Sequence, residues 1–337
     1  MNAHPSDHDT NSTLSEHLAW QALQSTVAVY WPQTVGLIKL TGADRARFLH
    51  NQSTNDIQGL RVGQFCETVF VTSTGRTLDL TTALILDQEM ILQVSPQRRD
   101  FLLGWMDRYL FPMDNVQLHD LSSTYTWISL IGPGAKAQLA QWGLPVPSPS
   151  QMALAGPSDA PFYLLPQTGL DLPGYTIIFP VTQQTQFQPW IESAGLEVMG
   201  EDLWEHLRVQ QGRPAPGMEL TEDYNPLEAG LWRAISFTKG CYIGQETIAR
   251  LNTYQGVKQR LWGIRLERPV APGTPLMVAE EKVGLITSLS PLDSGLGLAY
   301  VRTKAGGQDL RVQAGDSTGL ITAVPYLSHE YYRPSSS

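Results

Sequence analysis

The residues best suited to chemistry lie in one octapeptide, Lys239 to Glu246, with the sequence KGCYIGQE. It holds one of the two cysteines of the chain, between two glycines whose backbone freedom can lift a side chain into a cleft. The thiolate is the reactive form of cysteine, and both Lys239 and a helix beginning near Gly244 favour the thiolate of Cys241. Glu246 opposes this effect modestly. A small buried cysteine in a tight turn is the alternative interpretation, and these residues alone leave both open.

Two carboxylates are candidates for holding a ligand rich in N–H groups. Glu228, in the sequence NPLEAGL, can accept paired hydrogen bonds from a pterin or a guanidinium group. The alternative is an ordinary glutamate in the first turn of a helix after Pro226. Asp79 follows Arg76 on a predicted hairpin. It is either a partly buried acid that faces a cleft or a solvated strand residue paired with Arg76.

Composition narrows the function classes. The 337 residues are 42% apolar and 16% charged, which is typical of a globular chain with a sizeable core. The net charge of −9 gives no general attraction for phosphate backbones, so nucleic-acid binding would need a local basic patch. Cys66 and Cys241 are too few for a disulfide framework, which predicts a reducing compartment, the cytoplasm. The spacing of cysteines and histidines predicts no metal site, and no apolar run is long enough to span a membrane.

The helices and strands that must position these residues can be predicted from the sequence pattern. They indicate an α+β fold with largely antiparallel strands. A helix is expected over 97–110, where apolar side chains recur at helical spacing. The other predicted helices cover 44–51, 135–142 and 184–194, and the predicted strands cover 35–40, 67–73, 77–86, 90–94, 125–131 and 175–180.

Three regions follow from this pattern. Residues 1–25 are polar and predict a flexible N-terminus. Residues 26–255 form the α+β region, interrupted by a proline-rich loop near 144–162. Residues 256–330 contain six short predicted strands separated by Gly and Pro turns, which is typical of a small β-barrel.

Ordered motifs give the chain a family resemblance. KGCYIGQE resembles the signature of the folate-binding YgfZ family, which is related to the aminomethyltransferase (T-protein) of the glycine cleavage system. Weaker segments resemble the same family in the same order, over about residues 30 to 327. These are FLHNQSTND (48–56), STGR (73–76), the segment Arg208 to Pro214, PLEAGL (226–231) and GLITS (284–288).

The resemblance implies a GcvT/YgfZ-like fold of three lobes around a channel that binds tetrahydrofolate. It implies that Cys241 and Lys239 are the reactive pair, with Lys239 holding the charge of the thiolate. It further implies a role in assembly or repair of iron–sulfur proteins, including one that thiolates tRNA. Candidate folate-binding residues are Trp204, whose indole could stack on a pterin, and Glu228, Asp79, Tyr242 and Gln245.

Departures from the T-protein pattern favour an accessory factor over an enzyme. Where the T-protein has paired acids, this chain has Leu78 and Asp79, and where it has a glutamate in RLEAG, this chain has Gln210. The T-protein also lacks the cysteine of the octapeptide. The favoured function is a monomeric, tetrahydrofolate-binding factor whose partners are iron–sulfur clients or their assembly machinery.

Two alternatives stay open at this point. One is a folate-dependent aminomethyltransferase that depends on Asp79. The other is a folate-independent adaptor that binds apo-clients or tRNA through a loop region rich in basic residues, namely Arg233, Lys239, Arg250, Lys258 and Arg260.

Overall fold

The computed structural model describes residues 7–333 and divides into two compact units. The first unit combines Met1–Val35 with Ser122–Glu205, and the second combines Gly36–Leu121 with His206–Ser337. The chain passes from the first unit to the second after Val35 and again after Glu205, and the second of these points lies within helix α6 (Glu201–Gln211). Both units are therefore built from two separate stretches of the chain.

The first unit contains a six-stranded sheet in the order β11-β1-β7-β10-β9-β8. Its pairs are antiparallel except β1 with β11. Phe187 and Ile191, one helical turn apart on α5, pack in the same core as Ile177 and Phe179 of β10. The elements are β1 (Ala28–Tyr30), β7 (Tyr125–Ile131), α4 (Ala135–Gln141), β8 (Ala153–Ala155), β9 (Phe162–Leu165), β10 (Gly174–Pro180), η2 (Val181–Gln183), α5 (Gln184–Ser193) and β11 (Glu197–Met199).

Helix α1 (Asp7–Ser25) occupies most of the segment for which the sequence predicts a flexible N-terminus. Ala19 and Leu23, four residues apart, are buried and give the helix an apolar stripe that the polar composition hides. The helix packs beside β11 and β1. Residues 1–6 of the predicted segment lie outside the described part of the chain.

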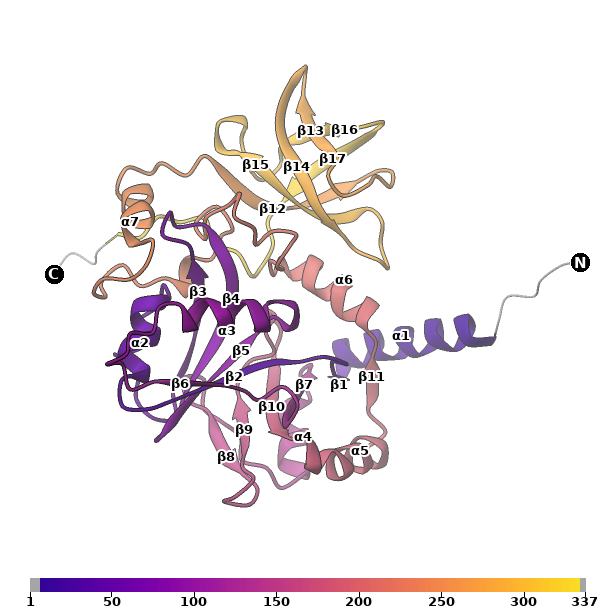
Figure 1. Ribbon diagram of the computed structural model, residues 1–337. Coiled ribbons are helices and arrows are strands. Elements are labelled where there is room, and N and C mark those ends of the chain that lie inside the picture. The colour runs from indigo at the N-terminus through magenta and orange to yellow at the C-terminus, as the bar shows by residue number, and fades with distance from the viewer. Residues whose placement is uncertain (1–6, 334–337) are drawn as a thin grey trace, which may run out of the picture. The chain divides into compact units, whose positions relative to one another are not determined.

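The second unit contains a five-stranded antiparallel sheet in the order β3-β4-β5-β2-β6. Helices α2 and α3 cover one of its faces (Figure 1), because Leu49 of α2 and Leu102 and Met106 of α3 share a core with Ile38 and Phe70. The elements are β2 (Gly36–Thr41), α2 (Arg45–Gln52), β3 (Phe65–Val71), β4 (Thr77–Ile85), β5 (Glu89–Val94), η1 (Pro96–Arg98), α3 (Arg99–Asp107) and β6 (Gln117–Asp120).

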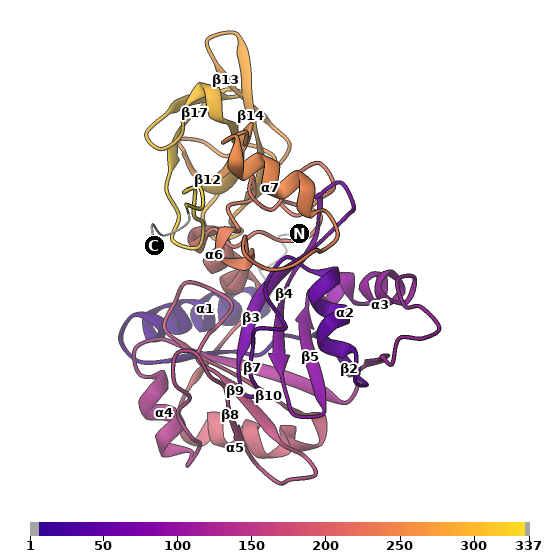
Figure 2. The same cartoon turned by 90° about the vertical axis from the view of Figure 1, so that its left-hand side faces the viewer.

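The opposite face of this sheet positions the octapeptide. Side chains on a strand alternate between faces, so Val69 and Val71 point away from Phe70. They pack with Leu227, Tyr242 and Ile248, which come from the segment between α6 and the barrel. That segment contains η3 (Trp232–Ala234) and α7 (Gln245–Thr253), and Figure 2 shows α7 beside the tip of the β3–β4 hairpin.

The C-terminal strands form a closed antiparallel barrel in the order β12-β15-β14-β13-β16-β17, which confirms the predicted barrel. Its core is apolar and includes Ile264, Ile286 and Ile321. The elements are β12 (Gln259–Leu266), β13 (Pro275–Val278), β14 (Glu281–Leu289), β15 (Leu296–Arg302), η4 (Thr303–Ala305), β16 (Arg311–Ala314) and β17 (Ser317–Thr322). Among the described helices, none is long and apolar enough to cross a membrane.

Candidate functional site

Cys241 is exposed, in a loop between η3 and α7 of the second unit. The other cysteine, Cys66 on β3, is only partly exposed. Burial, reinforced by the neighbouring Glu67 carboxylate, raises the pKa of Cys66 to about 12. Cys66 is therefore a protonated packing thiol at neutral pH, and Cys241 is the thiol that solvent and ligands can reach.

The loop that carries Cys241 is fastened to the end of α2 and the residues that follow it. The ammonium group of Lys239 donates hydrogen bonds to the carbonyl oxygens of His50, Ser53 and Asn55. The backbone N–H of Ile243 donates to the carbonyl of Asn51 at 3.0 Å. The Cys241 loop is thus held on both sides by one short stretch of chain about 190 residues earlier.

Lys239 is buried, and its contacts differ from the role that the resemblance implies. An ammonium group has three N–H donors, and all three are used by backbone carbonyls. Burial lowers the pKa of Lys239 to about 7, while the charge of Asp56 acts in the opposite direction. Lys239 therefore fastens the loop, and the contacts of its Nζ give no support to a role as the charge partner of Cys241.

Two glycines fit the start of α7 against the β3–β4 turn. Gly244 has φ of 80° and Gly75 has φ of 74°, both in the left-handed region that favours glycine. A Cβ at Gly244 would lie 2.6 Å from the carbonyl oxygen of Thr72, and one at Gly75 would lie 3.2 Å from Cβ of Thr247. The STGR turn and the octapeptide, both singled out from the sequence, are therefore in direct contact.

His50 is a neighbour of this loop that sequence reasoning missed as a site residue. Its side chain is 7% exposed, and, outside residues 239–241, Nε2 is the nearest atom to the position that a Cβ on Gly240 would take, at 3.9 Å. On the other side of the ring, Nδ1 lies 3.3 Å from Oδ1 of Asp56 and 3.3 Å from the backbone N of Gln58. No spacing in the sequence brings residues 50 and 240 together, so the pattern held no signal for this contact.

Tyr242 and Gln245 flank the helix start differently. Tyr242 is buried, with its ring 4.7 Å from Nζ of Lys239, and burial raises the pKa of its hydroxyl. Gln245 is the first residue of α7 and is half-buried. Of the two, Gln245 is the residue with side-chain surface left for a ligand.

Asp79 fits neither interpretation drawn from the sequence. It is fully buried, and its two carboxylate oxygens accept hydrogen bonds from Ser95, Oδ1 from the hydroxyl at 2.7 Å and Oδ2 from the backbone N–H at 2.9 Å. Burial raises the pKa of Asp79 to about 6, against the lowering effect of these hydrogen bonds. The carboxyl group thus holds the start of η1. The guanidinium group of Arg76 does not pair with Asp79 and donates a hydrogen bond to the carbonyl oxygen of Asp223 instead.

Glu228 lies in a turn rather than in the first turn of a helix. The side chain of Asn225 accepts hydrogen bonds from the N–H groups of Leu227 and Glu228, which forms an Asx turn. The Glu228 side chain is 7% exposed, and Oε2 accepts a hydrogen bond from the backbone N–H of Asn225 at 3.1 Å. Arg76 approaches Oε2 to 3.8 Å, and burial raises the pKa of Glu228.

Trp204 belongs to the first unit, whereas the other candidate residues belong to the second. Its indole stacks on the ring of Tyr30, with centroids 4.0 Å apart and planes inclined by 6°. The hydroxyl of Tyr30 donates to Glu201 at 2.8 Å, which fixes the ring pair. One face of the indole is therefore already covered by an aromatic ring.

The residues of the second unit fit a pterin only in part. A pterin presents N–H groups, which a carboxylate with free lone pairs can accept. Both oxygens of Asp79 are occupied by Ser95, so Asp79 has little acceptor capacity left. Glu228 already accepts hydrogen bonds from the backbone of Asn225 and from the side chain of Gln259, so a pterin would have to use the remaining lone pairs of its carboxylate. Gln245, which is half-buried at the start of α7, is the other predicted residue with polar atoms to offer. Among residues 7–333, no group of three or more His, Cys, Asp or Glu side chains is arranged to hold a metal ion.

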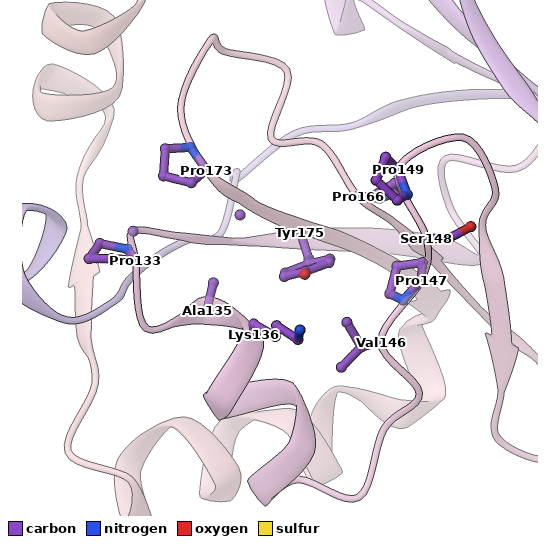
Figure 3. A pocket seen from close by; sticks show the side chains of 12 residues that line it. Pro133, Ala135, Lys136, Val146, Pro147, Ser148, Pro149, Pro166, Pro173 and Tyr175 are labelled. Atoms are coloured by element: carbon purple, nitrogen blue, oxygen red, sulfur yellow. The ribbon is translucent and has the colours of Figure 1, made fainter.

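A separate cavity of about 610 Å³ lies in the first unit, between α4 and the proline-rich loop. Figure 3 shows Lys136 and Tyr175 between prolines on two sides, with Pro133 and Pro173 on one and Pro147, Pro149 and Pro166 on the other. None of the residues that the sequence predicts for the site lines this cavity.

Comparisons with known proteins agree with one family. The family described as GCVT N-terminal domain matches residues 7–146. A protein of Arabidopsis thaliana named "Putative transferase At1g60990, chloroplastic" is 36% identical over 323 residues, which cover 93% of this chain and 74% of the relative. An aminomethyltransferase of Listeria monocytogenes is 27% identical, with 90% of this chain and 87% of the relative covered.

A solved structure shows the same fold. The glycine cleavage system aminomethyltransferase T from Bartonella henselae superposes with a TM-score of 0.81, over 95% of this chain and 91% of that one. Its sequence is 19% identical, so this likeness concerns the fold alone. Taken with the Arabidopsis relative, these matches show that the chain belongs to the GCVT family, which includes the aminomethyltransferases.

Proposed function

We propose that this protein is a tetrahydrofolate-binding factor that assists the assembly or repair of iron–sulfur proteins, and thereby tRNA modification, with Cys241 as its reactive group. The observation that carries the proposal is the exposed thiol on a loop that is fastened on both sides. A reactive thiol must be accessible and held in place, and Cys241 meets both conditions, whereas Cys66 is held on β3 but is only partly accessible.

The folate part of the proposal rests on family membership and on Glu228. Folate supplies one-carbon units when bound, and in this chain Glu228 would accept the N–H groups of the pterin, with Gln245 at the start of α7 beside the Cys241 loop. Burial of Glu228 favours this role, because a hydrogen bond is stronger where water is excluded. Trp204, on the first unit, stays a candidate for stacking.

The iron–sulfur part rests on the thiol. Cys241 supplies one thiolate, so an iron–sulfur cluster handled as cargo would need its other ligands from the client protein or from a small thiol. The partners that we infer are therefore iron–sulfur clients or their assembly machinery, in a reducing compartment such as the cytoplasm, with the protein acting as a monomer.

Aminomethyl transfer is the second candidate, and the names of the relatives favour it. It requires turnover of an aminomethyl donor with tetrahydrofolate and dependence on Asp79. The hydrogen bonds from Ser95 to both oxygens of Asp79 speak against that dependence. Turnover of an aminomethyl donor by the wild-type protein, abolished in Asp79→Asn, would establish this candidate instead.

Calorimetric titration with folinic acid tests the folate part. We expect saturable binding to the wild-type protein and binding weakened about tenfold or more in Glu228→Gln, because an amide offers one acceptor oxygen where the carboxylate offers two. Glu222→Gln is the matched control, since Glu222 is exposed and lies six residues away. The absence of any heat of binding in the wild-type protein would favour a folate-independent adaptor for apo-clients or tRNA.

A further inference from the structure

The cavity of the first unit has walls of rigid backbone. Proline fixes φ, so proline walls have little conformational entropy to lose when a ligand binds. Two backbone hydrogen bonds hold the turn after β7 in place, from the N–H of Gly132 to the carbonyl of Pro173 at 2.9 Å and from the N–H of Gly134 to the carbonyl of Thr26 at 2.7 Å. The cavity is therefore preformed within this unit. Five of its twelve lining residues are prolines, namely Pro133, Pro147, Pro149, Pro166 and Pro173.

Lys136, near the start of α4, gives the cavity a positive charge. It is the only Lys or Arg residue in the first unit, whose two chain segments carry ten Asp and Glu residues. None of these acids lines the cavity, and Lys136 forms no hydrogen bond or ion pair with any residue in the described part of the chain. An ammonium group in a preformed cavity without acids attracts an anion, and a single cation balances a single negative charge.

The hydroxyl of Tyr175 is a second hydrogen-bond donor in the cavity. Tyr175 lies on β10, and its ring packs against the core that contains Ile177 and Phe179. Its hydroxyl forms no hydrogen bond with the residues that the structure describes. Figure 3 shows Tyr175 and Lys136 in the same space between the two groups of prolines. The cavity thus offers an ammonium group and a phenol group, both able to donate to a carboxylate.

We propose that this cavity binds an aromatic carboxylate. Lys136 and Tyr175 hold the carboxylate group, and the ring lies between the prolines, because proline rings pack well against aromatic rings. The volume of about 610 Å³ falls within the range of roughly 300 to 1,000 Å³ that is typical of small-molecule sites. A phosphate ester carries nearly two negative charges, which a single lysine does not balance. The site is independent of the proposed function, since no residue assigned to folate or to the Cys241 loop lines the cavity.

Calorimetric titration with 2-naphthoate tests the proposal, with 2-naphthamide as a neutral probe of the same shape. We expect saturable binding of 2-naphthoate to the wild-type protein and binding of 2-naphthamide that is about tenfold weaker or less. Lys136→Gln should weaken the binding of 2-naphthoate about tenfold, and Tyr175→Phe, which keeps the ring, about fivefold. Lys282→Gln is the matched control, because it makes the same substitution at an exposed lysine of the barrel.

Acetylation of lysines by N-hydroxysuccinimide acetate, followed by peptide mass spectrometry, locates the bound probe. The reaction slows at an amine that a ligand covers. Saturating 2-naphthoate should slow the acetylation of Lys136 several-fold and should leave that of Lys282 in the same molecule unchanged. The proposal would be overturned by a wild-type protein that does not bind 2-naphthoate, by equal binding in folded Lys136→Gln, or by a Lys136 that the probe does not protect.

Folinic acid distinguishes this cavity from the folate site of the proposed function. We expect Lys136→Gln to lose affinity for 2-naphthoate and to retain the wild-type response to folinic acid, whatever that response is. Weaker binding of folinic acid in Lys136→Gln would overturn the claim of an independent site. Failure of folinic acid to bind the wild-type protein, with 2-naphthoate still bound through Lys136, would contradict the proposed function and support the cavity.

Discussion

At the scale of single residues, burial decides which charged groups are available for chemistry. Lys239 was expected to hold the charge of the Cys241 thiolate and Asp79 to bind folate, yet both side chains are buried and hydrogen-bonded within the second unit. Cys241 and Cys66 differ in the same way, one exposed and the other packed. The residue types could be recognised in the sequence, but burial depends on contacts that adjacent residues do not reveal.

Asp79 leads to a prediction about pH and stability. Its folded pKa of about 6 lies above the reference value of 3.8, so between these pH values the folded state binds more protons than the unfolded state. The free energy of unfolding should therefore fall as the pH rises through this window, by about 3 kcal/mol at most.

Asp79→Asn should remove this part of the slope, because an amide does not titrate. Urea unfolding at a series of pH values from 4 to 7 measures it, with Asp87→Asn as the exposed control on the β4–β5 turn. An unchanged slope in Asp79→Asn would show that the buried carboxyl is not the group responsible.

At the scale of elements, the contact between the β3–β4 turn and the start of α7 sets the position of the Cys241 loop. Gly244→Ala should destabilise the protein by about 2 kcal/mol, because φ is 80° and the new Cβ would lie 2.6 Å from a backbone oxygen that cannot easily move. It should also alter the rate of Cys241 alkylation.

Gly217→Ala separates the two causes of this loss. Gly217 has nearly the same φ, 79°, but nothing lies within 4 Å of its Cβ position. Its substitution therefore carries the cost of the backbone conformation alone, and it should destabilise the protein less. If thermal or urea unfolding shows the same loss of stability in both variants, the close contact between the β3–β4 turn and α7 does not contribute to the loss in Gly244→Ala.

Some elements could be predicted closely from the sequence and others could not. The strands at 125–131 and 275–278 match β7 and β13, because β-rich runs end at Gly or Pro turns. Helix α1 was missed because its apolar stripe is narrow, and the three-residue strands β1 and β11 carry too few residues for a periodic pattern. The His50 contact needed the fold, since residues 50 and 240 meet only through strand pairing and loop packing.

At the scale of the whole molecule, a buried ionic cluster joins the barrel to the rest of the second unit. Glu219 is fully buried, and it pairs with Arg208 of α6 at 3.1 Å. It also accepts hydrogen bonds from the hydroxyls of Thr287 and Ser288 on β14, both at 2.6 Å. The cluster explains why the chain after α6 and the barrel belong to one compact unit.

Glu219→Gln should lower the free energy of unfolding by about 3 kcal/mol or more, because it leaves the buried Arg208 without its charge partner. Urea unfolding followed by tryptophan fluorescence measures the loss. Glu281→Gln is the control, since its pair with Arg302 is exposed and surface pairs contribute little. A loss no larger than that of the control would show that the cluster does not hold the barrel.

The most direct test of the account is complementation of cells that lack this protein, with the activities of iron–sulfur enzymes as the readout. Wild-type protein and Cys66→Ser should restore these activities, whereas Cys241→Ser should not, while it still unfolds as the wild type does and still binds folinic acid. Full restoration by Cys241→Ser would contradict the claim that the exposed thiol on the fastened loop is the functional group.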